Sequence, residues 1–290
     1  MPQKKQKLQM ETSKIENLSF CGGGVRIISE IGACEILESK GIIKQAKRVA
    51  GTSAGAIVST MIALGYTASE MKEIAFSLNF NDFEDGRLLE KLNVLDDYGI
   101  HTGNTFLHFI QSKIEAKTGS RYTTFAGMYA KGMKDLTVFA CNLNTKSLKI
   151  FNYEKTPNVS IADAVRCSMS IPLFFEVHQI DQNIYVDGGV FYNYPLTYFP
   201  EETTIGVCFN SYESEPDNKL KKGQFKKYIQ SLMSCLGNSQ SINLKENESQ
   251  LKRSIVIDSL GISAVDFDIT LPQKTAMYAS GLKAASEFFA

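Results

Sequence analysis

The hydrophobic positions of the chain alternate between short strand-like runs and longer stretches with helical spacing. Residues 15–21 form a short apolar run, and residues 27–39 follow with apolar side chains at helical intervals. The same succession returns with 47–51 as a strand and 54–64 as a helix. Because strands that alternate with helices build a parallel sheet covered by helices, the pattern predicts a three-layer α/β/α fold with a mostly parallel central sheet.

The remaining elements follow from the same rules. Thr67 and Glu70 have capping-box spacing, which predicts a helix over 68–78. The runs 135–142 and 148–153 predict a hairpin. Further predicted elements are strands at 183–186, 204–209 and 253–257 and helices at 161–169, 225–236 and 272–289.

Residues 80–130 differ from both flanks because they lack a strand pattern. Phe106, Leu107, Ile110 and Ile114 share one side of a predicted helix over 102–117. We therefore expect a helical insertion at about 80–130 that lies over the functional site. Its apolar face fits packing in the core, and a lid would have the same pattern.

Length and charge limit the classes of protein. The 290 residues suffice for one large domain, predicted over 14–290 after a disordered tail at 1–13. The formal net charge is zero, so no basic field favours nucleic acid. The six cysteines form no C-x-x-C pair, which favours buried thiols in a reducing compartment. We also expect that the protein binds no metal and no organic cofactor.

The sequence carries no membrane-spanning pattern. It has no apolar stretch of 18 residues, and its first ten residues lack the apolar run of a signal peptide. We therefore expect a cytoplasmic protein, and any contact that it makes with lipid must be peripheral. The missing leader argues against ordinary secretion and leaves export by a dedicated machine open.

A Gly-x-Ser-x-Gly pentapeptide lies at the predicted turn between strand 47–51 and helix 54–64. Glycines at 51 and 55 permit a sharp turn that exposes the Ser53 hydroxyl, as a nucleophile requires. The helix that follows points the positive end of its dipole at the same place. The alternative is structural: Ser53 could simply cap that helix.

Three consecutive glycines, Gly22, Gly23 and Gly24, separate the first strand from the first helix. Residues without Cβ at such a turn can direct several backbone N–H groups at one point and bind an anion. A dinucleotide loop would need Gly or Ala at 27, where the chain has isoleucine. A phosphate-binding P-loop would need a following Gly-Lys-Ser/Thr, which is absent from the sequence after these glycines.

Asp187 is the candidate acid. It ends a predicted strand in Val-Asp-Gly-Gly, although an Asp before glycine is also a common turn residue. The usual order of a Gly-x-Ser-x-Gly hydrolase is serine, acid and then histidine. The three histidines, at 101, 108 and 178, all precede Asp187. The nucleophile must therefore work with the aspartate alone, or the serine has no catalytic role.

Four blocks together resemble the patatin-like phospholipases, which share a Ser–Asp dyad with cytosolic phospholipase A2 enzymes. The blocks span roughly 15–200 in the expected order, and they are Leu18–Arg26, Gly51–Gly55, Cys167–Phe175 and Val186–Gly189 with Asn193-Tyr-Pro195.

The resemblance implies a role for each matching residue. Ser53 would be the nucleophile, Asp187 its base and the Gly22–Gly24 amides the oxyanion hole. Arg26 lies near that hole, where it could bind a phosphate or brace the loop. Ile27 departs from the family pattern, which has glycine there, and puts the fine geometry of the hole in question.

The predicted function is lipid acyl hydrolysis of the phospholipase A type through an acyl-enzyme. The alternatives are a neutral-lipid esterase, an acyltransferase, or a catalytically silent lipid- or partner-binding protein on the same fold. The sequence gives no sign of whether an activating protein partner is needed.

Overall fold

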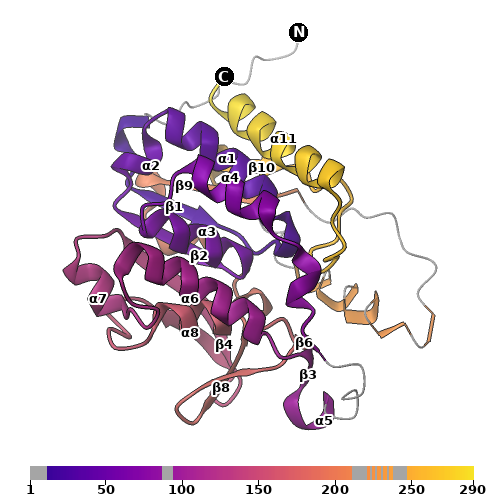
Figure 1. Ribbon diagram of the computed structural model, residues 1–290. Helices are drawn as coiled ribbons and strands as arrows, with labels where there is room; N and C mark the ends of the chain where they lie inside the picture. Colours follow the sequence, from indigo (N-terminus) through magenta and orange to yellow (C-terminus); the bar gives the residue numbers. More distant parts are fainter. Residues whose placement is uncertain are drawn as a thin grey trace.

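A central sheet organises the computed structural model, which describes residues 12–86, 94–210, 221–222, 224–225, 227–229, 231–233, 235–237 and 247–290 (Figure 1). Within these residues the strand order is β10-β9-β1-β2-β4-β8-β7, and β5 pairs with β4 off this path. The parallel strands are β1 (Asn17–Phe20), β2 (Arg48–Thr52), β4 (Asp135–Asn142), β9 (Thr204–Phe209) and β10 (Ser254–Ile257). The antiparallel strands are β5 (Ser147–Phe151), β7 (His178–Ile180) and β8 (Asn183–Asp187).

The α-helices are α1 (Ile27–Ser39), α2 (Ile42–Gln45), α3 (Ala54–Ala63), α4 (Ala68–Ser77), α5 (Val94–Asp97), α6 (Asn104–Thr118), α7 (Phe125–Ala130), α8 (Ile161–Ser168), α10 (Glu248–Lys252) and α11 (Leu271–Phe288). The 3-10 turns are η1 (Thr12–Lys14), η2 (Gly24–Arg26), η3 (Phe80–Phe83), η4 (Gly188–Val190), η5 (Pro195–Tyr198) and η6 (Glu201–Thr203). The predicted α/β class with a mostly parallel sheet is confirmed. Of the predicted tail at 1–13, residues 1–11 lie outside the described part of the chain, and Thr12 and Ser13 belong to η1.

The main core lies between the sheet and one layer of helices. Alternate residues of β2 show the division, because Val49 belongs to this core and Ala50 belongs to a small cluster on the opposite face. On that second face, Ala50 packs with Phe139 and Phe199, and η5 contacts β1, β2 and β9. In the helical layer, α11 contacts α1, α1 contacts α3, and α3 contacts α8.

Helices α1 and α11, which lie far apart in the sequence, pack closely against each other (Figure 1). A Cβ on Gly32 would lie 2.2 Å from the carbonyl oxygen of Tyr278, and one on Gly281 would lie 1.7 Å from that of Ser29. Both helices therefore need glycine where they cross, since a side chain there would force the backbones apart. This contact joins the start of the domain to its end.

The capping prediction for α4 is confirmed in full. The Thr67 hydroxyl accepts the N–H of Glu70 at 3.1 Å, and the Thr67 N–H donates to the Glu70 carboxylate at 2.7 Å. The two bonds satisfy amides that the first turn of a helix leaves without intrahelical partners.

The insertion at about 80–130 is mostly helical, with α5, α6 and α7, but it also contains a strand that the pattern did not predict. That strand, β3 (Gly99–His101), pairs in parallel with β6 (Leu173–Phe175) to form a second, two-stranded sheet. Three residues are too few to show an alternating pattern, and the partner strand lies far along the chain. The purely helical expectation was therefore wrong at β3.

Candidate active site

The turn between β2 and α3 holds Ser53 in a backbone conformation that few residues adopt, with φ 53° and ψ −122°. The flanking glycines make the turn possible. A Cβ on Gly51 would lie 2.1 Å from the Gly55 carbonyl oxygen, and one on Gly55 would lie 2.4 Å from the Phe20 carbonyl oxygen. The Ser53 side chain makes no capping hydrogen bond to α3. The alternative in which Ser53 only caps that helix is therefore wrong.

Asp187 ends β8, which approaches Ser53 from the direction opposite to β2. β2 runs parallel to β4, and its last pair is Thr52 with Phe139. β8 runs antiparallel to β4, and its last pair is Asp187 with Ala140. Since β5 pairs with β4 at both positions, β2 and β8 must share the other edge of β4. The carboxyl ends of the two strands therefore meet, and Ser53 is brought to Asp187.

The Ser53 hydroxyl lies near enough to the Asp187 carboxylate to lower the pKa of that carboxyl, as a hydrogen-bond donor does. The carboxylate also accepts a hydrogen bond from the Gly189 N–H at 2.7 Å. Asp187 is therefore a turn residue, as the sequence allowed, and it lies beside Ser53 as well. Burial raises the pKa of Asp187 from 3.8 to about 6, against the opposing effects of the Ser53 hydroxyl and the Gly189 N–H. At neutral pH such a carboxylate is ionised and is a better proton acceptor than an exposed aspartate.

The three histidines are engaged or exposed elsewhere. His101 packs against Phe174, with 4.7 Å between the ring centroids, and its Nδ1 accepts the Gly86 N–H at 3.1 Å. His178 Nε2 lies 3.0 Å from the Asp163 carboxylate, and His108 is exposed on α6. The causes of the Asp187 pKa shift include no imidazole.

The glycine loop after β1 lies beside this pair. A Cβ on Gly22 would lie 3.2 Å from the Ser53 Cβ and 2.2 Å from the Asn193 Oδ1. The Gly22 N–H already donates to the Asn193 carbonyl oxygen at 2.9 Å, so Gly22 contributes space rather than a donor. The amides of Gly23 and Gly24 make no hydrogen bond to any described residue, so both N–H groups of the loop remain available as donors.

Arg26 lies behind the loop. Its side chain is buried, its Nε donates to the Gly23 carbonyl oxygen at 3.0 Å, and its guanidinium lies 4.5 Å from the centre of the Phe209 ring. Burial lowers its pKa to about 10. Of the two roles that the sequence left open, this geometry fits bracing of the loop. Ile27, where the family pattern has glycine, begins α1 and lines an apolar pocket.

Two serines that the sequence analysis gave no role hold the pair in place. The buried Ser168 Oγ accepts the Ser53 N–H at 2.9 Å and donates to the Phe139 carbonyl oxygen at 2.5 Å. Two residues on, the Ser170 carbonyl oxygen accepts the Asp187 N–H at 2.8 Å. One short segment therefore fixes the backbone of both Ser53 and Asp187. Their presence in the Cys167–Phe175 block was the signal that could have found them.

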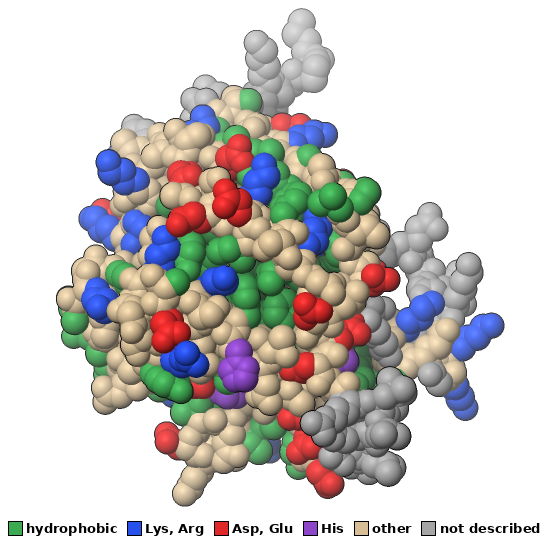
Figure 2. All heavy atoms as spheres, viewed as in Figure 1, with side chains coloured by type: hydrophobic (Ala, Val, Ile, Leu, Met, Phe, Trp, Pro, Cys, Tyr) green, Lys and Arg blue, Asp and Glu red, His purple; other side chains and the backbone are tan. Residues whose placement is uncertain are grey.

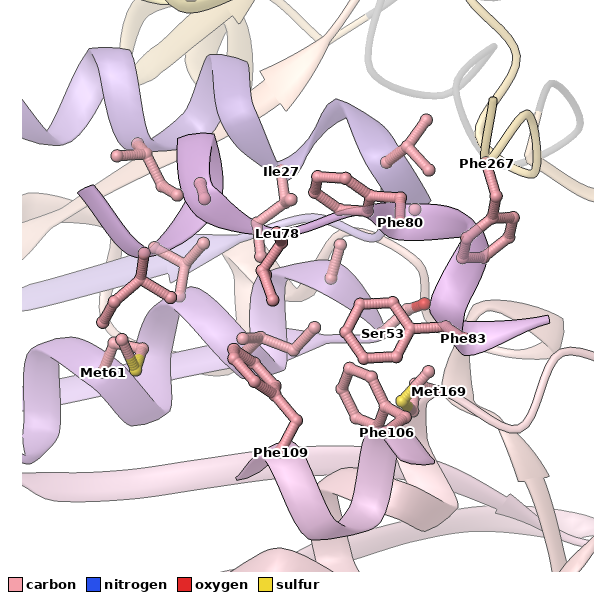
Figure 3. Close-up of a pocket in the computed structure, with 18 of the residues that line it drawn as sticks. Ile27, Ser53, Met61, Leu78, Phe80, Phe83, Phe106, Phe109, Met169 and Phe267 are labelled. Atoms are coloured by element: carbon pink, nitrogen blue, oxygen red, sulfur yellow. The ribbon is translucent and has the colours of Figure 1, made fainter. Parts of the chain in front are cut away.

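Ser53 lies where two pockets of different character meet. The first has about 760 Å³ of empty volume, including space open to solvent, and is lined almost entirely by apolar side chains of α1, α3, α4, η3 and α6. In Figure 3, Ser53 lies beside Phe83 and Phe106 at one end of this pocket, and Met61 lies at the other. Figure 2 shows hydrophobic side chains in a hollow between α4 and α6 on the same side of the molecule.

The second pocket is more polar and has about 520 Å³ of empty volume, again including open space. It is lined by the glycine loop, Ser53, Asp187 and Asn193, and by Met233 and Gly237 from a later segment. A molecule with one apolar and one polar end could therefore place the bond between them at Ser53.

Two further features bear on the chemistry. Among the described residues, no group of three or more His, Cys, Asp or Glu side chains is placed to hold a metal ion. None of the helices described is both long and apolar enough to cross a membrane.

Comparison with known proteins gives the family. The family model described as patatin-like phospholipase matches residues 18–200, which include Ser53, Asp187 and the glycine loop. The chain belongs to the patatin-like phospholipase family.

Two viral proteins are among the relatives of this chain. The uncharacterized protein R571 of Acanthamoeba polyphaga mimivirus is 29% identical over 287 residues, with 96% of this chain and 95% of that protein covered. A protein of Invertebrate iridescent virus 6 named probable lipid hydrolase 463L is 30% identical over 184 residues, 62% of each chain.

The fold also matches a solved structure, that of VipD from Legionella pneumophila. The TM-score is 0.66 at 16% identity, with 95% of this chain and 67% of that chain covered. At this identity the likeness shows a shared patatin-like fold.

Proposed function

We propose that this protein is a phospholipid acyl hydrolase of the phospholipase A type, with Ser53 as nucleophile and Asp187 as its base. The observation that carries the proposal is the approach of the Ser53 hydroxyl to the buried Asp187 carboxylate, at the junction of an apolar and a polar pocket. Membership of the patatin-like phospholipase family supports it.

The reaction proceeds in two halves. Asp187 takes the Ser53 proton as the hydroxyl oxygen attacks the ester carbonyl carbon, and then returns that proton to the departing lysophospholipid alcohol. A water molecule then attacks the acyl-enzyme, with Asp187 as its base, and releases the fatty acid and free Ser53. A pKa of about 6 suits Asp187 to both transfers, because the group is ionised at rest and can hold a proton briefly.

The negative charge on the carbonyl oxygen needs donors that are not already engaged. The Ser53 N–H is held by Ser168, and the Gly22 N–H is held by Asn193. The proposed donors are therefore the amides of Gly23 and Gly24, supported by the positive end of the α3 dipole. Each such donor contributes about 3–4 kcal/mol to the transition state.

The two pockets suggest how a phospholipid binds. The acyl chain would lie in the apolar pocket along α3, where Ile57, Val58 and Met61 follow Ser53 on one helix face. The glycerol and headgroup would lie in the polar pocket. Burial of each methylene of the chain in this arrangement contributes about 0.8 kcal/mol.

Product analysis tests the proposal. Mixed phospholipid vesicles are incubated with the wild type, with Ser53→Ala and with Ser39→Ala, whose serine lies exposed at the end of α1. We expect free fatty acid and lysophospholipid from the wild type and from Ser39→Ala, none from Ser53→Ala, and covalent labelling of Ser53 by a fluorophosphonate.

Other outcomes are equally informative. Release of fatty acid only from triacylglycerol would indicate a neutral-lipid esterase, and transfer of the acyl group to an added alcohol would indicate an acyltransferase. No product and no fluorophosphonate label would indicate a silent binding protein and contradict the proposal.

A further inference from the structure

A basic and aromatic surface lies on the segment between β9 and α10. The sequence from 219 to 237 contains five lysines and no acidic residue, in a chain whose formal net charge is zero. Among the described residues of this segment, Lys221, Lys222 and Lys227 are exposed. Figure 2 shows Lys and Arg side chains standing out at the right, where Figure 1 draws this segment in orange.

Large apolar side chains are exposed beside these lysines. Phe225, Tyr228 and Leu232 are 42%, 49% and 39% exposed, although such side chains are normally placed in the core. The described residues from 225 to 237 are helical, and spacings of three and four residues put these three side chains on one side of a helix. Ile229, by contrast, is fully buried in the main core and ties the segment to the domain.

The same segment reaches the candidate active site. Met233 and Gly237 line the polar pocket together with Ser53 and Asp187. Whatever binds the exposed side of the segment is thus held next to the pocket proposed for the headgroup.

We propose that the surface formed by Lys221, Lys222, Phe225, Lys227, Tyr228 and Leu232 docks the protein onto an anionic phospholipid membrane. Lysines around an exposed aromatic and aliphatic face are the combination that binds the interface of such a membrane: the apolar side chains enter the acyl boundary and the ammonium groups pair with lipid phosphates. A membrane of neutral lipid would offer a partner only to the apolar side chains, whereas an anionic membrane also attracts the lysines. The inference rests on the proposed function for its purpose, since a docked enzyme would take its substrate directly from the bilayer.

Vesicle co-sedimentation tests the docking surface apart from hydrolysis. The full chain with Ser53→Ala, which leaves the lipid intact, is mixed with vesicles of phosphatidylcholine alone or with added phosphatidylserine. We expect strong binding to the mixed vesicles that weakens with salt. The triple variant Lys221→Gln, Lys222→Gln, Lys227→Gln should lose about two orders of magnitude in partitioning, because each lysine contributes about fivefold at such a surface.

Two further variants separate charge from apolar contact. Phe225→Ser with Tyr228→Ser should weaken binding to both kinds of vesicle. The matched control Lys131→Gln, Lys146→Gln, Lys155→Gln removes three exposed lysines elsewhere and should bind as the parent does. With Ser53 restored, both docking variants should hydrolyse a water-soluble short-chain ester at the wild-type rate, which shows that they fold.

Several results would overturn the docking surface. One is a lysine variant that binds mixed vesicles as tightly as the parent, and another is a control variant that loses as much vesicle affinity as the lysine variant. A third is a parent chain that binds no vesicles, which would indicate that this surface binds a protein partner. If the wild type binds vesicles through these residues and hydrolyses no ester, the docking surface stands and the proposed hydrolase function fails.

Discussion

The two sides of the candidate active site are built in opposite ways. On the nucleophile side, the conformation of Ser53 is set by a turn whose glycines lie within two residues of it. On the acid side, the position of Asp187 depends on the pairing of β8 with β4 and on a main-chain hydrogen bond to Ser170. A local motif can therefore specify the turn of the nucleophile, whereas the acid is positioned only by contacts with distant parts of the chain.

The largest effect should come from the acid itself. Asp187→Asn keeps the size and the acceptor oxygen but removes the base, and we expect the kcat for ester hydrolysis to fall by roughly 10⁴-fold or more. The same variant should be more stable above pH 6. The wild-type aspartate has a pKa of about 6 when folded against 3.8 when unfolded, so ionising the buried carboxylate costs the wild type on the order of 3 kcal/mol in the folded state.

Kinetic assays and thermal melts at pH 8 check both halves of this prediction. A variant that lost activity and also melted at a lower temperature would show that Asp187 supports the fold, and its loss of activity could not be assigned to the base.

Substitution of Ser168, in the segment that hydrogen-bonds to both Ser53 and Asp187, should have the next largest effect. Ser168→Ala leaves the buried Ser53 N–H without its acceptor, which costs about 1–3 kcal/mol of folding stability. Because this hydrogen bond holds the backbone of the proposed nucleophile, we also expect the kcat to fall by roughly tenfold to a hundredfold. The KM should change little, because Ser168 lines neither pocket. Steady-state kinetics on a soluble ester measure both constants.

Ser170→Ala is the matched control for Ser168→Ala. Ser170 holds Asp187 through its carbonyl oxygen, which the substitution keeps, although the side-chain bond to Arg166 is lost. A larger loss of kcat in Ser170→Ala than in Ser168→Ala would contradict the assignment of Ser168 as the residue that positions Ser53.

The pH dependence sharpens the acid side further. Since Asp187 acts as a base and its pKa is about 6, the kcat/KM should fall about tenfold per pH unit below 6 and reach a plateau above it. Stability should change in the opposite direction, decreasing as the pH rises from 3.8 to 6, because the folded state binds the proton more tightly than the unfolded state. A midpoint near 4 in the activity profile would mean that the carboxylate is not desolvated in the free enzyme.

The smallest effect should come from the histidines. His108→Gln and His178→Gln alter imidazoles on α6 and β7 that have no part in the proposed dyad, so the kcat should stay within about twofold of the wild-type value. His101→Gln removes a ring that packs on Phe174, and a lower melting temperature is expected there with similar activity. Loss of activity in any one of them without loss of folding would contradict the two-residue mechanism.

Much of the fold was predictable because its signals are local. Helix α1 matches the predicted range 27–39, and α3, α4, β9 and β10 agree to within a residue or so with their hydrophobic patterns. The capping box of α4 and the hairpin of β4 and β5 depend on residues a few positions apart, so their physical causes are contained in short windows of sequence. The short strands β3 and β6 were missed for the converse reason: each exists only because the other is its partner.

For the site, the sequence by itself determined the residue types, the strained Gly-x-Ser-x-Gly turn and the lack of a histidine after Asp187. Only the tertiary structure decided that the Ser53 hydroxyl lies beside the Asp187 carboxylate, because two strands running in opposite directions share one edge of β4. It also decided which loop amides remain available, since Asn193 occupies the Gly22 N–H and Ser168 occupies the Ser53 N–H. Hydrogen-bond partners and desolvation depend on groups brought together from distant parts of the chain, and no sequence window contains them.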